Sequence, residues 1–416
     1  MDIDWLNLAV FCGLWAGHLA LAVGIVNRVH GWPLPELALR LVRRLHDAAV
    51  FILPPVFAWF AGIEGPRLFL GGRWGQLPLA LLAYLAICGA LALALPAVAL
   101  SRRFRAARTS PLTNHARTID IAGELGFRPL GYGPHRILTH VPGNEFLKLE
   151  VADQEYRLAG LPAAWDGLSI LHLSDVHFIG TIDRPYFERV FRIAADVPAD
   201  ITVFTGDLLD REALIDWIPE TFGLLSAPLG CYFILGNHDA RLRNTEEIRR
   251  RLEQIGWRGV AGKVRVIDHL AERLVLCGSE LPWMGMQPDL AAVPEGAFRL
   301  FLSHTPDNIG WAREHAIDLM LSGHNHGGQV RLPLFGPVYS PSLYGARYAS
   351  GAFWEPPTLL YVSRGISGKH PLRWNCPPEI TRIVLRSRVA INAQRGLNAH
   401  EHKHGFAAAP AAALRD

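Results

Sequence analysis

Residues 168–177 read LSILHLSDVH, an apolar run of strand length that ends abruptly in polar residues. The same pattern recurs in DITVFTGDLLD (200–210), CYFILGNHD (231–239), RLVLCGSE (273–280), RLFLSHTPD (299–307) and DLMLSGHNH (318–326). Two short β-rich runs, 145–151 and 155–161, precede the series. Buried runs that alternate with polar loops and helical stretches predict a layered α/β fold, in which function lies at the strand ends.

The polar residues at these strand ends are oxygen and imidazole donors. They are Asp175, His177, Asp207, Asp210, Asn237, His238, His304, His324 and His326. Such a mixture suits Mn, Fe or Zn, whereas an all-oxygen set suits Mg or Ca. Two metals fit better than one, because a dinuclear centre with a bridging carboxylate stabilises both the attacking and the leaving oxygen of a phosphoryl displacement. We therefore expect two divalent metal ions, with Mn as the first candidate and Fe or Zn as alternatives.

The spacing within the motifs suggests how the donors converge. Residues two apart in a strand point to the same face, so Asp175 and His177 are expected to face one centre, as are His324 and His326. Glycines beside the last pair allow the backbone to turn close to the metals. Each motif alone has an ordinary explanation, such as a turn aspartate or a hydrogen-bonded structural histidine. Five of them in order, each at a predicted strand end, favour a metal centre.

The ordered set D-x-H, G-D-x-x-D, G-N-H-D, H and G-H-x-H resembles the calcineurin-like metallophosphoesterase superfamily over residues 145–388. The resemblance implies a four-layer α/β/β/α sandwich built on two facing mixed sheets. It also implies two ligand sets, which are Asp175, His177 and His326 for one metal and Asn237, His304 and His324 for the other, with Asp207 as the bridge. His238 would be the general acid, and Asp210 would orient its ring, since a histidine can change protonation near neutral pH.

Finer features resemble a bacterial branch of this superfamily that includes membrane-attached enzymes. They are LPAAWDGLSILHLSDVH (161–177), LSHTPD (302–307), GHNHGGQVRLP (323–333) and LYVSRGISG (360–368), followed by CPPEI (376–380). The branch is linked to hydrolysis of UDP-2,3-diacylglucosamine in lipid A synthesis. The resemblance therefore implies a lipid-linked or nucleotide-linked phosphate substrate.

Four arginines follow or adjoin the motifs, namely Arg211, Arg331, Arg364 and Arg373. Guanidinium groups are well suited to phosphate oxygens, so these are candidate substrate-binding residues. Each can equally be a surface or salt-bridge arginine. The stretches 281–287 and 339–354 are rich in aromatic and Met side chains, which suit either acyl chains or the domain core.

Three apolar segments precede the α/β region, within a membrane region predicted at 1–108. Residues 6–26 and 77–100 are long enough to span a bilayer as helices of about 20 residues. Residues 46–63 are shorter and contain Pro54 and Pro55, so a re-entrant or interfacial segment is the alternative. A connector along the membrane surface is predicted at 109–144, and a disordered tail at 389–416.

Arginine placement predicts the orientation. One cluster follows the first segment and the other follows the third, and they comprise Arg28, Arg40, Arg43, Arg44, Arg102, Arg103, Arg105 and Arg108. Both clusters should be cytoplasmic, which requires three spans, with everything after Ser101 in the cytoplasm. We therefore predict a multi-pass protein of the bacterial inner membrane whose catalytic domain faces the cytoplasm.

Composition narrows the classes of function. A net charge of +3 without a long basic face argues against nucleic acid as a partner. Five scattered cysteines without a CxxC pair predict free thiols in a reducing compartment. Two classes stay open, with the oligomeric state undecided. One is a membrane-anchored dinuclear hydrolase acting on UDP-2,3-diacylglucosamine, on phospholipid or on soluble phosphodiesters. The other is a non-catalytic membrane scaffold that binds phosphate. The presence of both His238 and Asp210 favours the enzyme.

Overall fold

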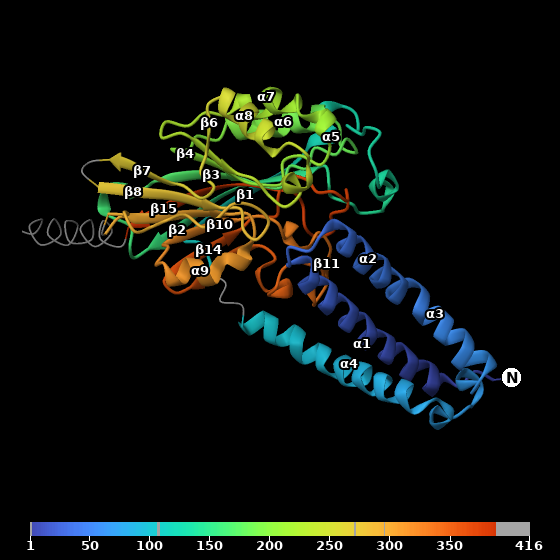
Figure 1. Cartoon of the computed structure of the whole chain (residues 1–416). Coiled ribbons are helices and arrows are strands. Elements are labelled where there is room, and N and C mark those ends of the chain that lie inside the picture. The colour runs from blue at the N-terminus through green and yellow to red at the C-terminus, as the bar shows by residue number, and fades with distance from the viewer. Residues whose placement is uncertain (1, 106–108, 270–271, 295, 388–416) are drawn as a thin grey trace, which may run out of the picture.

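The computed structural model describes residues 2–105, 109–269, 272–294 and 296–387. Two facing mixed sheets carry helices on their outer faces, and three long helical segments extend away from them (Figure 1). This is the four-layer α/β/β/α sandwich, preceded by apolar helices, that the sequence predicts. The tail predicted to be disordered at 389–416 lies outside the described residues.

The first sheet has seven strands in the order β1-β2-β15-β3-β4-β5-β6. Their bounds are β1 Thr113–Asp120, β2 Lys148–Leu158, β15 Glu379–Ser387, β3 Ser169–Leu173, β4 Ile201–Thr205, β5 Cys231–Ile234 and β6 Trp257–Gly259. Strands β3 to β6 pair in parallel, so their carboxyl ends share one edge of the sheet. Helices α5 Ile121–Leu125, α6 Arg184–Ala195, α7 Trp217–Thr221 and α8 Thr245–Gln254 cover its outer face (Figure 1).

The second sheet has six strands in the order β13-β14-β10-β9-β8-β7. Their bounds are β13 Gly351–Glu355, β14 Thr358–Val362, β10 Leu319–Ser322, β9 Phe298–Ser303, β8 Glu272–Ser279 and β7 Val264–His269. Helix α9 Ile309–Glu314 packs on its outer face, and a separate hairpin pairs β11 Arg331–Leu332 with β12 Gly336–Pro337. Strands β8, β9, β10 and β14 are parallel, so this sheet also has a shared carboxyl edge.

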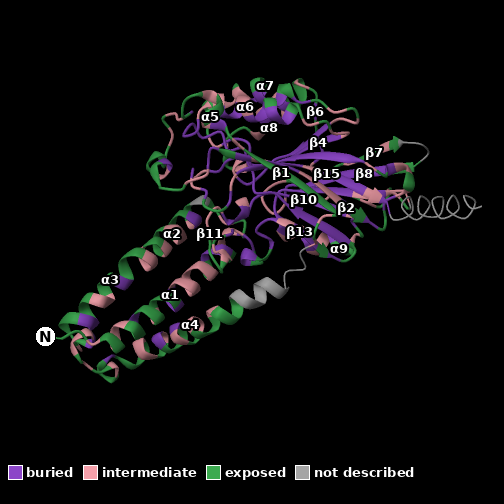
Figure 2. Cartoon of the chain, turned by 180° about the vertical axis from the view of Figure 1, so that it is seen from behind, coloured by how far each residue is buried: buried purple, intermediate pink, exposed green. Residues whose placement is uncertain are grey.

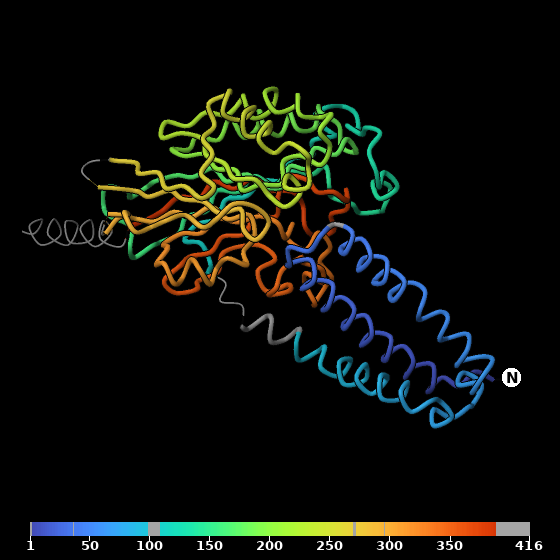
Figure 3. The backbone as a smooth tube through the Cα atoms, viewed as in Figure 1, coloured from blue at the N-terminus to red at the C-terminus, as the bar shows by residue number. Residues whose placement is uncertain are grey.

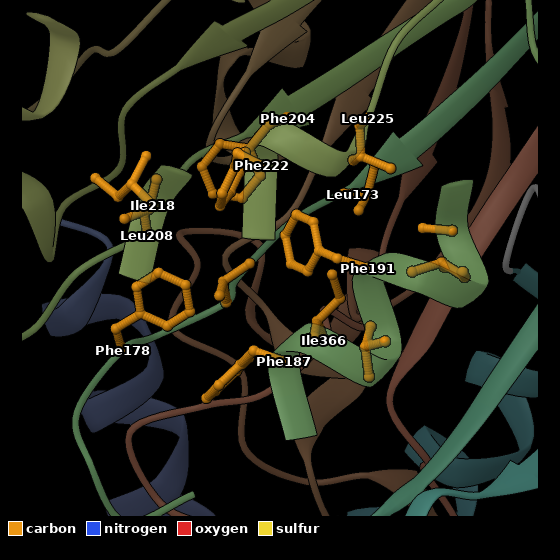
Figure 4. Packing of buried hydrophobic residues seen from close by; sticks show 14 of the residues in the cluster. Leu173, Phe178, Phe187, Phe191, Phe204, Leu208, Ile218, Phe222, Leu225 and Ile366 are labelled. Atoms are coloured by element: carbon orange, nitrogen blue, oxygen red, sulfur yellow. The ribbon is translucent and has the colours of Figure 1, made fainter. Parts of the chain in front are cut away.

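Strand alternation explains the layering, because successive side chains point to opposite faces of a sheet. In β3, Leu171 and Leu173 pack against the helices, whereas Ile170 packs between the two sheets. Phe204 of β4 likewise faces the helices, among a dense set of aromatic rings (Figure 4). Each such fully buried side chain contributes roughly 1.5–3 kcal/mol. The strands are buried on both faces, which is why the sequence shows unbroken apolar runs.

The stretch 109–144 differs from the predicted connector. It contains β1, which pairs antiparallel with β2 from Thr113↔Glu155 to Asp120↔Lys148, and α5, whose Ile121 is fully buried. The first six residues of β1 are exposed, because this strand forms the edge of the sheet. An exposed edge strand shows no apolar alternation, so its sequence does not reveal it. The folded sandwich therefore includes residues before 145.

The N-terminal region has three helical segments long and apolar enough to cross a membrane, Trp5–His30, Leu37–Glu64 and Leu79–Val98. They belong to α1 Trp5–His30, to a run comprising α2 Glu36–Asp47, η1 Ala48–Ile52, α3 Leu53–Phe57 and η2 Ala58–Glu64, and to α4 Leu79–Arg105. Large apolar side chains, among them Leu79 at 83% and Leu93 at 84%, are exposed along them (Figure 2). Apolar surface of this extent calls for a lipid environment.

The middle segment is longer than the predicted 46–63 and stays helical through its two prolines. Short π-helical stretches, η1 and η2, flank α3, which contains Pro54 and Pro55. A proline has no N–H to donate to the preceding turn. His18 of α1 supplies a donor there, since its Nε2 lies 2.7 Å from the Ala49 carbonyl oxygen, and its Nδ1 lies 2.5 Å from the Tyr84 hydroxyl of α4. His18 thus links all three segments.

Candidate metal centre

The predicted donors converge where the carboxyl edges of the two sheets meet. Asp175 and His177 follow β3, Asp207 and Asp210 follow β4, and Asn237 and His238 follow β5 in the first sheet. His304 follows β9, and His324 and His326 follow β10 in the second sheet. Parallel strands place these loops side by side, and the sandwich brings the two sets face to face.

The backbone conformation of the loops, and not the alternation of a strand as predicted, orients the paired donors. Asp175 and His177 lie beyond the end of β3, and His324 and His326 lie beyond β10, so strand alternation does not orient them. Instead all four have positive φ, of 53°, 50°, 69° and 48° respectively, as does Asp207 at 58°. Non-glycine residues rarely adopt this left-handed conformation, which costs roughly 1–3 kcal/mol each. The rest of the fold must therefore hold these loops, and strain of this kind is concentrated at functional sites.

The donors form two groups that share one carboxylate. Asp175, His177, Asp207 and His326 offer ligand atoms within 4.8 Å of one another, and so do Asp207, His304 and His324. Asp207 belongs to both groups, which is the arrangement that a dinuclear centre requires. Asn237 adjoins the second group, because its Oδ1 lies 3.0 Å from His304 Nε2.

The electrostatics of these groups fit cations. Burial lowers the pKa of His324 and of His326 far below the usual value, so both imidazoles are neutral and keep a lone pair to donate. Burial also lowers the pKa of His177 and of His304, but the surrounding carboxylates outweigh it and raise both to about 9. A buried site that stabilises positive charge and directs neutral nitrogens inward suits divalent metals such as Mn, Fe or Zn.

Asp210 lies between two histidines instead of serving one. Its Oδ1 is 2.6 Å from His238 Nδ1, and its Oδ2 is 2.8 Å from His177 Nδ1. Burial raises the pKa of Asp210, yet the two imidazoles hold it well below its ordinary value. Asp210 therefore orients a metal-ligand candidate as well as the proposed acid, which the motif pattern did not reveal.

Asp239, the last residue of the GNHD motif, is a supporting residue that the sequence reasoning missed. Its carboxylate is fully buried and accepts hydrogen bonds from the backbone N–H groups of Asp207, Leu208, Leu209 and Gly236, at 2.8–3.2 Å. It therefore holds the loop that presents Asp207. The adjoining Gly236 has no room for a side chain, because an added Cβ would lie 2.2 Å from Asp207 Oδ1.

The two aromatic-rich stretches divide between the core of the catalytic domain and its surface, where Tyr339, Tyr344 and Trp354 are exposed. Trp283 packs against the ligand candidates His304 and His324, with ring centroids 5.7 and 4.9 Å apart. Tyr348 and Phe353 are buried in the core beneath the second sheet. Met286, by contrast, is 70% exposed.

The four candidate arginines separate into two kinds. Arg364 is paired with Glu379 and Glu150, and the fully buried Arg373 donates to the backbone oxygens of His326, Arg364 and Ser367. Both side chains are therefore used in contacts within the protein that support the backbone around His326. Arg331 donates to the Gly327 oxygen and to Ser350, while Arg211 is exposed and makes one long contact, 3.4 Å, to the Ile179 oxygen.

Residues 168–328 match the family model for calcineurin-like phosphoesterases. The Escherichia coli (strain K12) phosphodiesterase YaeI is 30% identical over 223 residues, which cover 52% of this chain and 81% of the relative. The chain belongs to the calcineurin-like phosphoesterases. Another member, the uncharacterized metallophosphoesterase YkuE of Bacillus subtilis (strain 168), is 29% identical over 62% of this chain and 90% of its own length. The UDP-2,3-diacylglucosamine pyrophosphatase LpxG of Chlamydia muridarum is 25% identical over 56% and 88% respectively.

As a calcineurin-like phosphoesterase, the chain is a metal-dependent hydrolase with a buried His/Asp cluster. Divalent metals in such a cluster supply Lewis-acid activation of the phosphoryl group and of water. Asp210 holds the His238 ring through Nδ1, so Nε2 is the nitrogen that faces away from Asp210, and it lies 3.4 Å from Arg241 Nη1.

Proposed function

We propose that this chain is a membrane-anchored phosphoesterase that hydrolyses a phosphoanhydride or phosphodiester bond in a lipid-linked substrate. The first candidate is UDP-2,3-diacylglucosamine, with water giving UMP and the acylated sugar 1-phosphate. We also propose Mn as the metal and the cytoplasmic face of a bacterial inner membrane as the location. Within the site we assign Asp207 as the bridge between two metals, His238 as the general acid and Asp210 as the residue that orients it.

The proposal of a lipid-linked substrate rests on one contact between the apolar helices and the catalytic domain. Helix α1 is in direct contact with the loop that follows the metal-ligand motif, since Asn27 exchanges hydrogen bonds with the Val338 oxygen and the Ser340 nitrogen, at 3.1 and 3.0 Å. Attachment to apolar helices keeps the active centre at the bilayer surface, where lipid-linked substrates are located. A soluble substrate gains little from this attachment. The relative LpxG is a UDP-2,3-diacylglucosamine pyrophosphatase, which supports the same class of substrate.

The test uses purified full-length protein in mixed micelles with Mn. Its substrates are UDP-2,3-diacylglucosamine, a phospholipid, a cyclic nucleotide and a soluble aryl phosphodiester. We expect release of UMP from the first at a kcat/KM well above that for the soluble diester. Rapid hydrolysis of soluble diesters with no action on either lipid would reject the proposal.

A second candidate is a phosphodiesterase that acts on phospholipid or soluble diesters. The relative YaeI, which is 30% identical, is a phosphodiesterase, and this similarity favours the second candidate. Preference for the phospholipid or the cyclic nucleotide in the same panel would select this alternative.

A further inference from the structure

The carboxyl end of α1 and the amino end of α2 lie beside the catalytic domain (Figure 3). Besides the Asn27 hydrogen bonds, His30 at the end of α1 packs against Tyr339, with ring centroids 6.3 Å apart. Gly31 touches the same loop, because an added Cβ would lie 2.8 Å from the Leu343 backbone nitrogen. Residues of the membrane region therefore contact the loop 338–343, which follows the His326 motif in the sequence.

Two arginines, one from each part of the molecule, approach this boundary. Arg241 follows the GNHD motif, and its Nη1 lies 3.4 Å from Nε2 of His238, the proposed general acid. Arg43 of α2 lies 3.5 Å from Nε2 of His30 through its Nη2. Burial raises the pKa of Tyr339, and the charges of Arg43 and Arg241 oppose this rise while Asp47 adds to it. Both guanidinium groups thus lie close enough to influence the hydroxyl of Tyr339.

Most of the charged groups near these arginines are cationic, and Asp47 is the acidic exception that acts on Tyr339. Across the described residues, neither Arg43 nor Arg241 has a carboxylate within ion-pair distance, and their contacts are to histidines. His135 and His370 adjoin the same region, with ring centroids 4.3 Å apart. Burial lowers the pKa of His370 to about 4, and the nearby charges of His135, Lys369, Arg43 and His238 act in the same direction. Cationic groups without a protein counter-ion are suited to bind an anion of the substrate.

We propose that Arg43 and Arg241 form a subsite for a second phosphate group of the substrate, next to the phosphate that is hydrolysed. The membrane region then supplies part of the active site as well as the anchor. This inference rests on the proposed function in its phosphoanhydride form, because a simple phosphodiester has no second phosphate. Arg241 holds the group beside His238, and Arg43 holds it from the membrane side.

The test compares Arg43→Gln and Arg241→Gln in the full-length protein. The matched control is Arg44→Gln, which removes the same charge from the next residue of α2, where the side chain is exposed. The substrates are UDP-2,3-diacylglucosamine in mixed micelles, soluble UDP-glucose and a soluble aryl phosphodiester. For each test variant, kcat/KM for both diphosphates relative to the diester should fall roughly 10- to 100-fold, the loss expected for a charge-assisted hydrogen bond. The control variant should keep the wild-type ratio.

Two results would overturn the subsite. One is an unchanged ratio in both test variants. The other is a loss confined to the micellar substrate, with hydrolysis of soluble UDP-glucose unchanged, which would assign Arg43 to the lipid surface. A wild-type protein that cleaves no phosphoanhydride would instead reject the phosphoanhydride form of the proposed function. The subsite is then judged by inhibition of diester hydrolysis, where methylenediphosphonate should inhibit the wild type at least 10-fold more strongly than Arg43→Gln. Equal inhibition would overturn it.

Discussion

Asp207 is the one carboxylate common to both groups of metal donors. We expect Asp207→Ala to abolish hydrolysis and to lower the bound metal, because one bridging carboxylate serves both ions. Metal content per chain after gel filtration in Mn, together with hydrolysis of an aryl phosphodiester, measures both effects. Asp289→Ala is the control, since this aspartate is exposed and its hydrogen bond within the described part of the chain is a local one from the Ala291 nitrogen.

His238 has a different role at the same centre. His238→Ala should leave the metal content nearly intact while kcat falls by about 10²–10⁴, the usual contribution of acid–base catalysis. Its ring is held through Asp210, so the metal donors keep their positions when it is removed. The division between a bridging and a proton-donating residue would be wrong if both substitutions removed metal equally.

At the scale of elements, the metal donors lie on the loops that follow the strands. Asp239 fixes the loop that contains Asp207 through hydrogen bonds to its backbone. We expect Asp239→Asn to lower thermal stability and metal affinity together. An amide presents only one oxygen to the four backbone N–H groups, and its NH₂ opposes the others. Burial and the neighbouring Asp207 raise the pKa of Asp239 to about 7, so the loss should be largest above that pH, where hydrogen bonds to the charged carboxylate contribute roughly 1.5–3 kcal/mol each.

Thermal unfolding and metal titration measure the effect of Asp239→Asn. The conservative control is Asp289→Asn, made at an exposed position. A variant that unfolds at the wild-type temperature and binds Mn as tightly would contradict the supporting role of Asp239.

For the whole molecule, the arrangement of the helices leads to a topology prediction. The N-terminus lies at the end of the helical region far from the sheets, and α1 runs toward the catalytic domain (Figure 1). A reporter fused after Ser101 or at the C-terminus should behave as cytoplasmic, and one near Gly71 as external, because arginine-rich ends stay inside. Paired alkaline phosphatase and fluorescent protein fusions measure this. An external C-terminal reporter would mean that the orientation is reversed or that the middle segment does not span.

Much of this protein is readable from its sequence because the relevant signals are local. Strand-length apolar runs that end in Asp, His or Asn predicted a layered α/β fold with nine polar donors at its strand ends, and the superfamily resemblance implied the sandwich. Apolar length and arginine placement predicted the three N-terminal segments. Strand β1 escaped detection because an exposed edge strand buries too little surface to leave a pattern.

The sequence by itself determined which donors are present, since the chemistry of a carboxylate or an imidazole belongs to the residue type. Only the tertiary structure decided their geometry and partners. Asp210 contacts both His177 and His238, Asp239 holds the Asp207 loop, and Arg364 and Arg373 support the framework. Arg43 contacts His30, which packs against Tyr339 of the catalytic domain, although its sequence position is that of a membrane-flanking charge. These relations join residues far apart in the chain, and only packing of the two sheets and the helices brings such residues into contact.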